Sequence, residues 1–147
     1  MAIDRFDTID RIATRIGERA ERDGLASLSL VEKTVLLPWW ASGIIGNGGF
    51  QYFYEGASEA AEVADAFDRI GCPAAAEACR KSLEVFPSGV PPADHEARRG
   101  FLDSIQDEDH TLFEPLDEII WQITDNELES RLEIYIEANR QTLSPLL

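Results

Sequence analysis

Apolar residues recur every three or four positions along most of this 147-residue chain, and this spacing constrains the fold more than any other feature. In residues 4–23, for example, Ile9, Ile12, Ile16 and Ala20 fall on one side of a helix. No segment alternates polar and apolar residues over the length of a strand. The sequence therefore predicts an all-α protein, a single compact domain of six or seven helices over residues 1–147.

Capping and stop signals place the expected helices along the chain. Ser29 and Glu32 fit a capping box that starts a helix near Leu30. Several glycines predict a break in the chain before a short aromatic helix over residues 50–55: Gly43, Gly46, Gly48 and Gly49. Ser58 and Asp94 are each expected to cap a later helix. The remaining helices are expected over residues 58–70, 73–86, 94–105, 112–123 and 127–143.

The chain carries 28 Asp and Glu residues against 13 Lys and Arg, which gives a formal net charge of −15 at pH 7. Proteins bind phosphates through Lys and Arg, so this balance argues against direct binding to nucleic acid or to a membrane surface and favours a basic partner. The excess is concentrated in residues 94–147, which hold 14 acids and 4 bases. Because the N-terminus lacks a signal-peptide pattern and Pro38 and several glycines break the longest nearly uncharged stretch, we expect a cytoplasmic protein.

Neither the cysteines nor the histidines fit a cofactor or metal site. Cys72 and Cys79 lie seven residues apart in a predicted helical region. That separation is about 10 Å along a helix, which is too far for a disulfide. His95 and His110 have acidic neighbours but no partner at the spacing that metal sites on helices use. Because no nucleophile motif or Cys/His pairing is apparent either, the sequence predicts no metal, no cofactor and no catalytic residue.

The predicted final helix carries an acidic residue at every fourth position. Asp125, Glu129, Glu133 and Glu137 form a ridge that rises about 6 Å per step, which is comparable to the spacing of phosphates along a DNA strand. Two interpretations stay open: a solvated face in a generally acidic protein, or a surface for a basic partner. The candidate partner-binding surface consists of this ridge and five further acids: Asp107, Glu108, Asp109, Asp117 and Glu118.

The segment Asn47-Gly48-Gly49-Phe50 has two interpretations. Its backbone N–H groups can form a nest for an anion, although it lacks the Gly-Lys-Ser/Thr ending of a phosphate loop. We favour a structural role, in which glycine and asparagine supply positive φ between two packed helices and Phe50 enters the core. The same region gathers six of the thirteen aromatic residues, which form either the centre of the core or the lining of a pocket: Trp39, Trp40, Phe50, Tyr52, Phe53 and Tyr54.

These residues also carry a resemblance to a known family. Asn47-Gly48-Gly49-Phe50, followed by Tyr52 and Phe53, resembles the motif of the DNA-mimic protein (DMP-like) family, a bacterial domain of unknown function. Further marks follow in order: Ile70-Gly71, Phe86-Pro87, Asp94, Arg98, Tyr135 and Asn139. The resemblance implies a helical, family-like core over residues 29–143, preceded by an N-terminal helix and connector over residues 1–28. For at least one branch of the family, it also implies binding to a DNA-binding protein in place of DNA.

The charge pattern and the resemblance together predict a non-enzymatic protein that occludes the DNA-binding surface of a basic DNA-binding protein. Its carboxylates would take the places of phosphates against Arg and Lys side chains. The alternative is an enzyme or small-ligand-binding protein that uses the aromatic cluster around the Asn-Gly-Gly-Phe turn. Ile134 lies opposite the main apolar stripe of its predicted helix, and the need to cover it favours a homodimer.

Overall fold

The computed structural model describes residues 5–108, 112–124 and 126–147, and the side chains of all of these except 106–108. Within these ranges every regular element is a helix, which confirms the prediction of an all-α fold. The α-helices are α1 (Arg5–Asp23), α2 (Leu30–Gly56), α3 (Ala60–Arg69), α4 (Pro73–Leu83), α5 (His95–Glu108), α6 (Glu114–Ile123), α7 (Glu127–Ala138) and α8 (Arg140–Leu143). Short 3₁₀ turns span Leu25–Ser27, Pro87–Gly89 and Ser144–Leu146.

The described residues form eight α-helices, so the prediction of six or seven was wrong. The predicted final helix, residues 127–143, divides at Asn139, whose backbone has φ −115° and ψ 26°. The Asn139 side chain donates Nδ2 to the carbonyl of Tyr135 at 2.9 Å. Such a side-chain bond to the backbone competes with the regular helical ladder, and it accompanies the end of α7.

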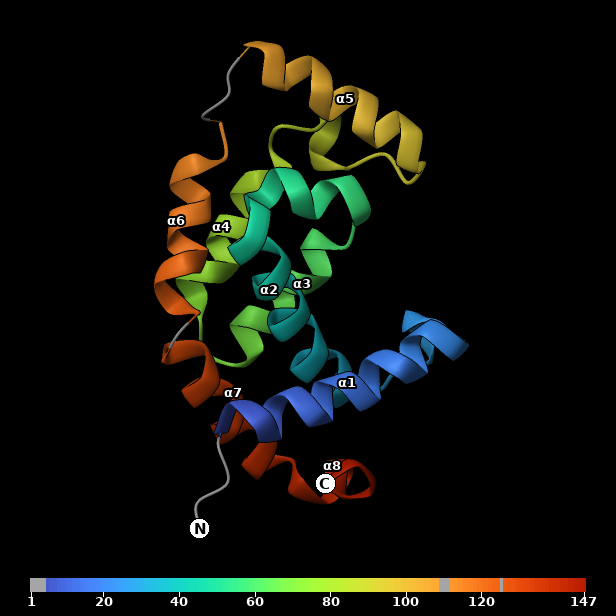
Figure 1. The fold of residues 1–147 in the computed structure, drawn as a ribbon, viewed down its shortest axis with the longest axis vertical. Coiled ribbons are helices and arrows are strands. Elements are labelled where there is room, and N and C mark those ends of the chain that lie inside the picture. Colours follow the sequence, from blue (N-terminus) through green and yellow to red (C-terminus); the bar gives the residue numbers. More distant parts are fainter. Residues whose placement is uncertain (1–4, 109–111, 125) are drawn as a thin grey trace.

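Helix α2 runs through the middle of the molecule, with α1, α3, α5 and α6 packed around it (Figure 1). Its start follows the prediction, because Ser29 Oγ accepts the N–H of Glu32 at 3.1 Å and Glu32 Oε1 accepts the N–H of Ser29 at 2.9 Å. The predicted break is confirmed at Gly49, where two helical segments meet across a kink inside α2, whereas the three earlier glycines keep helical geometry. A Cβ atom at Gly43 or Gly46 would meet open space, so their surroundings do not require glycine.

Helices α3 and α4 form a hairpin that packs beside α2. Gly71, with φ 85°, lies in the turn between them. Ser58 does not cap α3 as predicted, since its own N–H donates to Oε2 of Glu59, the residue that precedes the helix. Cys72 and Cys79 are buried free thiols, in agreement with their spacing. Burial raises the pKa of Cys79 to about 12 and that of Cys72 to about 11.

The aromatic cluster divides between the core and its edge. Three members are fully buried: Phe50, Phe53 and Tyr54. The ring of Phe50 packs against Phe113, and the ring of Tyr54 packs against both Phe86 and Phe113, from other parts of the chain. Tyr52 is 52% exposed, and the two remaining members are partly buried: Trp39 and Trp40. No helix within the described ranges is long and apolar enough to cross a membrane.

Candidate functional site

The motif over residues 47–50 has the predicted structural role, because it forms the kink between the two helical segments of α2 and Phe50 is buried in the core, although only Gly49 supplies the positive φ. Gly49 has φ 74° and ψ −173°, a conformation that favours glycine. The N–H of Phe50 donates to Oδ1 of Asp117 on α6 at 2.8 Å. A Cβ atom at Gly49 would collide with the same carboxylate, and one at Gly48 would collide with a side chain one turn later. The geometry of the kink therefore requires both glycines.

A second side chain of α6 binds α2 on the other side of the kink. Trp121, one turn after Asp117, donates Nε1 to the carbonyl of Ile45 at 2.9 Å. The two hydrogen bonds fasten the bend in α2 to α6, one before Gly49 and one after it. We call this arrangement the kink clamp, and it consists of Gly48, Gly49, Phe50, Asp117 and Trp121.

Asp117 lies inside the kink clamp and is only partly accessible to solvent. Burial raises the pKa of its carboxyl, and the hydrogen bond from Phe50 offsets part of this effect because it favours the charged form. The N–H of Phe50 thus binds a carboxylate of the same chain instead of an external anion. This position separates Asp117 from the exposed acids with which the sequence pattern grouped it.

Two residues of the family resemblance shape α5: Asp94 caps its start, and Arg98 fastens it to the end of α2. Asp94 caps α5 as predicted, by accepting the N–H of Ala97 at 2.9 Å. Arg98 is 4% exposed and donates Nε to the carbonyl of Tyr54 at 2.6 Å and Nη1 to that of Pro92 at 2.9 Å. A guanidinium is favourable at the C-terminal end of a helix, where carbonyl groups lack helical partners. These residues therefore build the scaffold.

The family described as DMP19-like protein matches the chain over residues 26–139. The chain belongs to the DMP19-like protein family. The matched residues include α2 to α7 and the whole kink clamp, whereas α1 lies outside the match. Comparisons with curated proteins and with solved structures find no match.

The acidic ridge predicted on the last helix is not uniform. Glu133 and Glu137 are exposed, whereas Glu129 is partly buried. Oε2 of Glu137 lies 3.2 Å from Nη1 of Arg140, and Oε2 of Glu129 lies 4.0 Å from Nη2 of Arg5. Of these three glutamates, only Glu133 has no ion pair among the residues that the structure describes.

The other acids of the predicted surface are distributed over α5 and α6 and beyond. Glu118 is exposed on α6. Asp107 and Glu108 belong to the last turn of α5, and their side chains lie outside the described part of the molecule. Asp109 and Asp125 lie outside the described residues. The candidate partner-binding surface is therefore described from the exposed acids of α5, α6 and α7 whose side chains the structure describes.

Acidic residues outnumber basic residues on these three helices. Residues 100–130 contain ten Asp and Glu and no Lys or Arg. Helices α5, α6 and α7 follow one another around one edge of the molecule (Figure 1). We call the six exposed acids on them that follow residue 100 the acidic rim: Asp103, Glu114, Glu118, Glu127, Glu133 and Glu137. Within the described ranges only Glu137 of the rim forms an ion pair, so most of this negative charge is unpaired.

Proposed function

We propose that this protein is a DNA mimic that binds a basic DNA-binding protein through the acidic rim and occludes its DNA-binding surface. The separation of charge carries this proposal, because residues 100–130 hold ten acids and no Lys or Arg. Membership of the DMP19-like family supports it. The proposed mechanism is competitive binding, and it involves neither a catalytic residue nor a cofactor.

The acidic rim suits a cationic groove for physical reasons. Hydrogen bonds between carboxylates and Arg or Lys are roughly twice as strong as those between neutral groups. Attraction between opposite charges also speeds association, and it is screened beyond about 10 Å at 0.1 M salt. The kink clamp fastens α6 to the central helix, and Glu114 and Glu118 on α6 share that support. A partner held in this way should dissociate at high salt, as it does from DNA.

Capture on the immobilised protein tests this function. An extract of the source organism is applied at low salt, and the bound proteins are then challenged separately with excess duplex DNA and with high salt. We expect a DNA-binding protein that both treatments release, since DNA and the acidic rim would compete for one cationic surface. A captured DNA-binding protein that stays bound in excess duplex DNA would contradict occlusion.

The alternative of a ligand site at the kink receives less support from the contacts of Phe50. Its side chain is fully buried and packs against the rings of Phe53, Tyr54 and Phe113. Its N–H is taken by Asp117. Phe50 therefore offers a ligand neither its ring nor its N–H, and the acidic rim is the better candidate.

We also propose that the protein acts in the cytoplasm as a homodimer that covers Ile134, which is 59% exposed on α7. Ile134 and Glu133 are consecutive, so their side chains point about 100° apart on the helix. Sedimentation of the wild type and of Ile134→Glu tests the dimer. A monomeric wild type would contradict the dimer without affecting the proposal for the acidic rim.

A further inference from the structure

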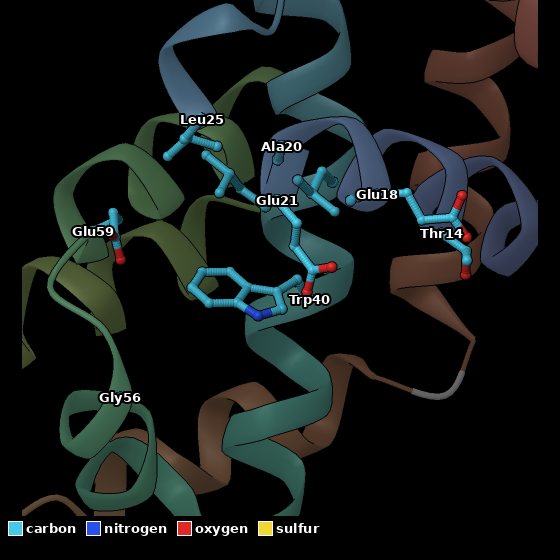
Figure 2. Close-up of a pocket in the computed structure, with 11 residues that line it drawn as sticks. Thr14, Glu18, Ala20, Glu21, Leu25, Trp40, Gly56 and Glu59 are labelled. Atoms are coloured by element: carbon cyan, nitrogen blue, oxygen red, sulfur yellow. The ribbon is translucent and has the colours of Figure 1, made fainter. Parts of the chain in front are cut away.

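A groove lies between α1, α2 and the segment before α3, on helices that the acidic rim does not use (Figure 2). Its volume of about 640 Å³ falls within the range of small-molecule pockets, roughly 300–1,000 Å³. Its floor is largely apolar and includes Leu36, Leu37 and Trp40. Three carboxylates border it: Glu18 and Glu21 from α1, and Glu59 before α3.

No basic side chain in the groove neutralises these carboxylates. No Lys, Arg or His belongs to its lining. Glu18 and Glu21 have neither a hydrogen bond nor an ion pair from their side chains to any residue that the structure describes. Glu59 accepts the N–H of Ser58 at 3.0 Å. The groove is therefore an apolar surface bordered by negative charge.

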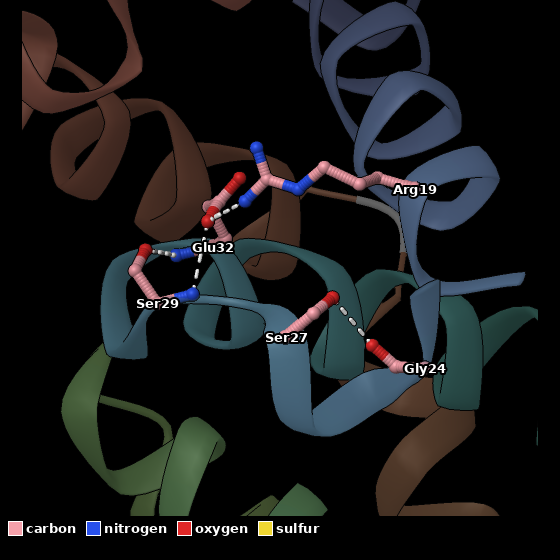
Figure 3. A network of polar contacts seen from close by, with 5 residues as sticks. All are labelled: Arg19, Gly24, Ser27, Ser29 and Glu32. Atoms are coloured by element: carbon pink, nitrogen blue, oxygen red, sulfur yellow. Dashed lines mark hydrogen bonds and ion pairs between the residues drawn. The ribbon is translucent and has the colours of Figure 1, made fainter. Parts of the chain in front are cut away.

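The arginines next to these glutamates in the sequence bind elsewhere. Arg19 contacts Glu32 in the capping box of α2, as Figure 3 shows. Nε of Arg22 lies 3.3 Å from Oδ2 of Asp23. Neither arginine lines the groove, so an external cation would meet no competing guanidinium there.

Trp40 gives the groove an aromatic wall beside the charges. Figure 2 shows its indole ring next to the Glu21 side chain, with Glu59 across the groove. The ring is held by an edge contact with Phe53, with 5.6 Å between ring centroids. The face of a tryptophan ring attracts cations within about 6 Å. The groove thus combines an apolar floor, an aromatic wall and unpaired carboxylates.

We propose that this groove binds a small organic cation whose apolar body ends in an ammonium or guanidinium group. The apolar body would rest on Leu36 and Leu37, and the charged end would lie between Trp40 and the glutamates. An adjoining hollow of about 360 Å³ also includes Trp40, but its lining contains one base and one acid, Arg99 and Glu55. The excess of negative charge therefore directs the cation to the first groove.

This site is independent of the proposed DNA mimicry. Glu18 and Glu21 lie on α1, before residue 26, where the family match begins. The acidic rim lies on α5, α6 and α7. Failure of either proposal consequently leaves the other standing.

Titration with 2-phenylethylammonium, followed by the backbone amide and indole resonances in NMR spectra, tests the site. We expect saturable shifts for the Trp40 indole and for the amides of Glu18 and Glu21, and none for the Trp121 indole. The neutral analogue 2-phenylethanol should bind about tenfold more weakly, because it lacks the charge that the ring and the carboxylates attract. Equal affinity for the two molecules, shifts confined to the acidic rim, or no shifts would each overturn the proposal.

A double variant, Glu18→Gln with Glu21→Gln, removes two charges while it keeps the size of both side chains. We expect about tenfold weaker binding of 2-phenylethylammonium and unchanged binding of 2-phenylethanol. Glu62→Gln, at an exposed position of α3 outside the groove lining, is the control and should leave both affinities unchanged. If the control weakened cation binding as much as the double variant, net charge would account for the attraction and the proposal would fail.

Discussion

Helix α1 and residues 100–130 differ in how they use charge. Helix α1 carries five acids and five arginines, whereas residues 100–130 carry ten acids and no Lys or Arg. Four of these arginines bind within the molecule: Arg15 donates to the carbonyl of Leu146 at 2.6 Å, Arg19 pairs with Glu32, Arg22 pairs with Asp23, and Arg5 donates to Asn126. A general bias toward acidic composition would affect both regions alike. The difference therefore indicates that negative charge is separated from positive charge within the chain.

Among the changes considered, charge reversal on the acidic rim should have the largest effect, and this effect should be on affinity for the basic partner. Glu118→Lys combined with Glu133→Lys places bases in a region where attraction to a basic partner is proposed. We expect an affinity loss of at least about 100-fold for the captured DNA-binding protein, because two attractive contacts become repulsive. Titration calorimetry at low salt measures this change.

The matched control for charge reversal is Asp23→Lys combined with Glu62→Lys. This double variant changes the net charge of the protein by the same amount, but on α1 and α3. Both residues are exposed and lie outside the rim. We expect at most a small loss of affinity, because screening weakens interactions beyond about 10 Å at 0.1 M salt. Equal losses in the two double variants would show that only net charge matters and would remove the rim from the mechanism.

Removal of Asp117 should affect folding more than partner binding, because this carboxylate is used inside the molecule. In Asp117→Ala the N–H of Phe50 loses its acceptor, and we expect the free energy of unfolding to fall by about 1–3 kcal/mol. Glu118→Ala, at the exposed neighbouring position, should change it by less than about 0.5 kcal/mol. Urea unfolding compares the variants, and equal effects would contradict the clamp.

Because Asp117 is partly buried, it should make folding stability depend on pH. Burial raises the folded-state pKa of Asp117 above its ordinary value of 3.8, the value expected in the unfolded chain. Between these two pKa values the folded protein binds more protons, so stability falls as pH rises from 3.8 through the raised pKa. The stability of Asp117→Asn relative to the wild type should therefore be greatest at neutral pH and decrease toward pH 3.8. Urea unfolding across this range would contradict the prediction if the difference stayed constant.

The smallest effect is expected at the contact between α1 and α7. Nη2 of Arg5 donates to Oδ1 of Asn126 at 3.0 Å and lies 4.0 Å from Oε2 of Glu129. Because the contact is partly solvated, Arg5→Ala should lower the free energy of unfolding by less than about 1 kcal/mol. It should also raise partner affinity by at most about threefold, since Glu129 loses its base. A reduced affinity in Arg5→Ala but not in Arg11→Ala would show instead that Arg5 supports the partner site.

Local signals predict much of the fold because they depend on residues that are close in the sequence. Helical spacing identifies the all-α class, and Ser29 and Asp94 cap helices as expected. The glycines of α2 correctly predict a break, because each lowers helix propensity by about 1 kcal/mol relative to alanine, but their number does not show at which glycine the break falls. Packing of α2 against the surrounding helices outweighs that preference, and only Gly49 leaves the helical conformation.

The kink clamp depends on contacts that local sequence does not reveal. Asp117 and Phe50 are separated by 67 residues, and nothing in the spacing of α6 distinguishes Asp117 from its exposed neighbour Glu118. Trp121 was missed for the same reason, because its partner is a backbone carbonyl in α2. The motif that carries the family resemblance therefore builds the scaffold. The acidic rim, in contrast, has a direct sequence signal in the lack of Lys and Arg over residues 100–130.

Cys72 and Cys79 are buried thiols at the turn and within α4 of the α3–α4 hairpin, and their pKa values are raised. Alkylating agents react with the thiolate, so both sulfurs should stay unmodified while the hairpin remains closed. Their rate of alkylation would therefore report how often this part of the chain opens. The two native cysteines can serve as built-in chemical probes of local unfolding, without any added label.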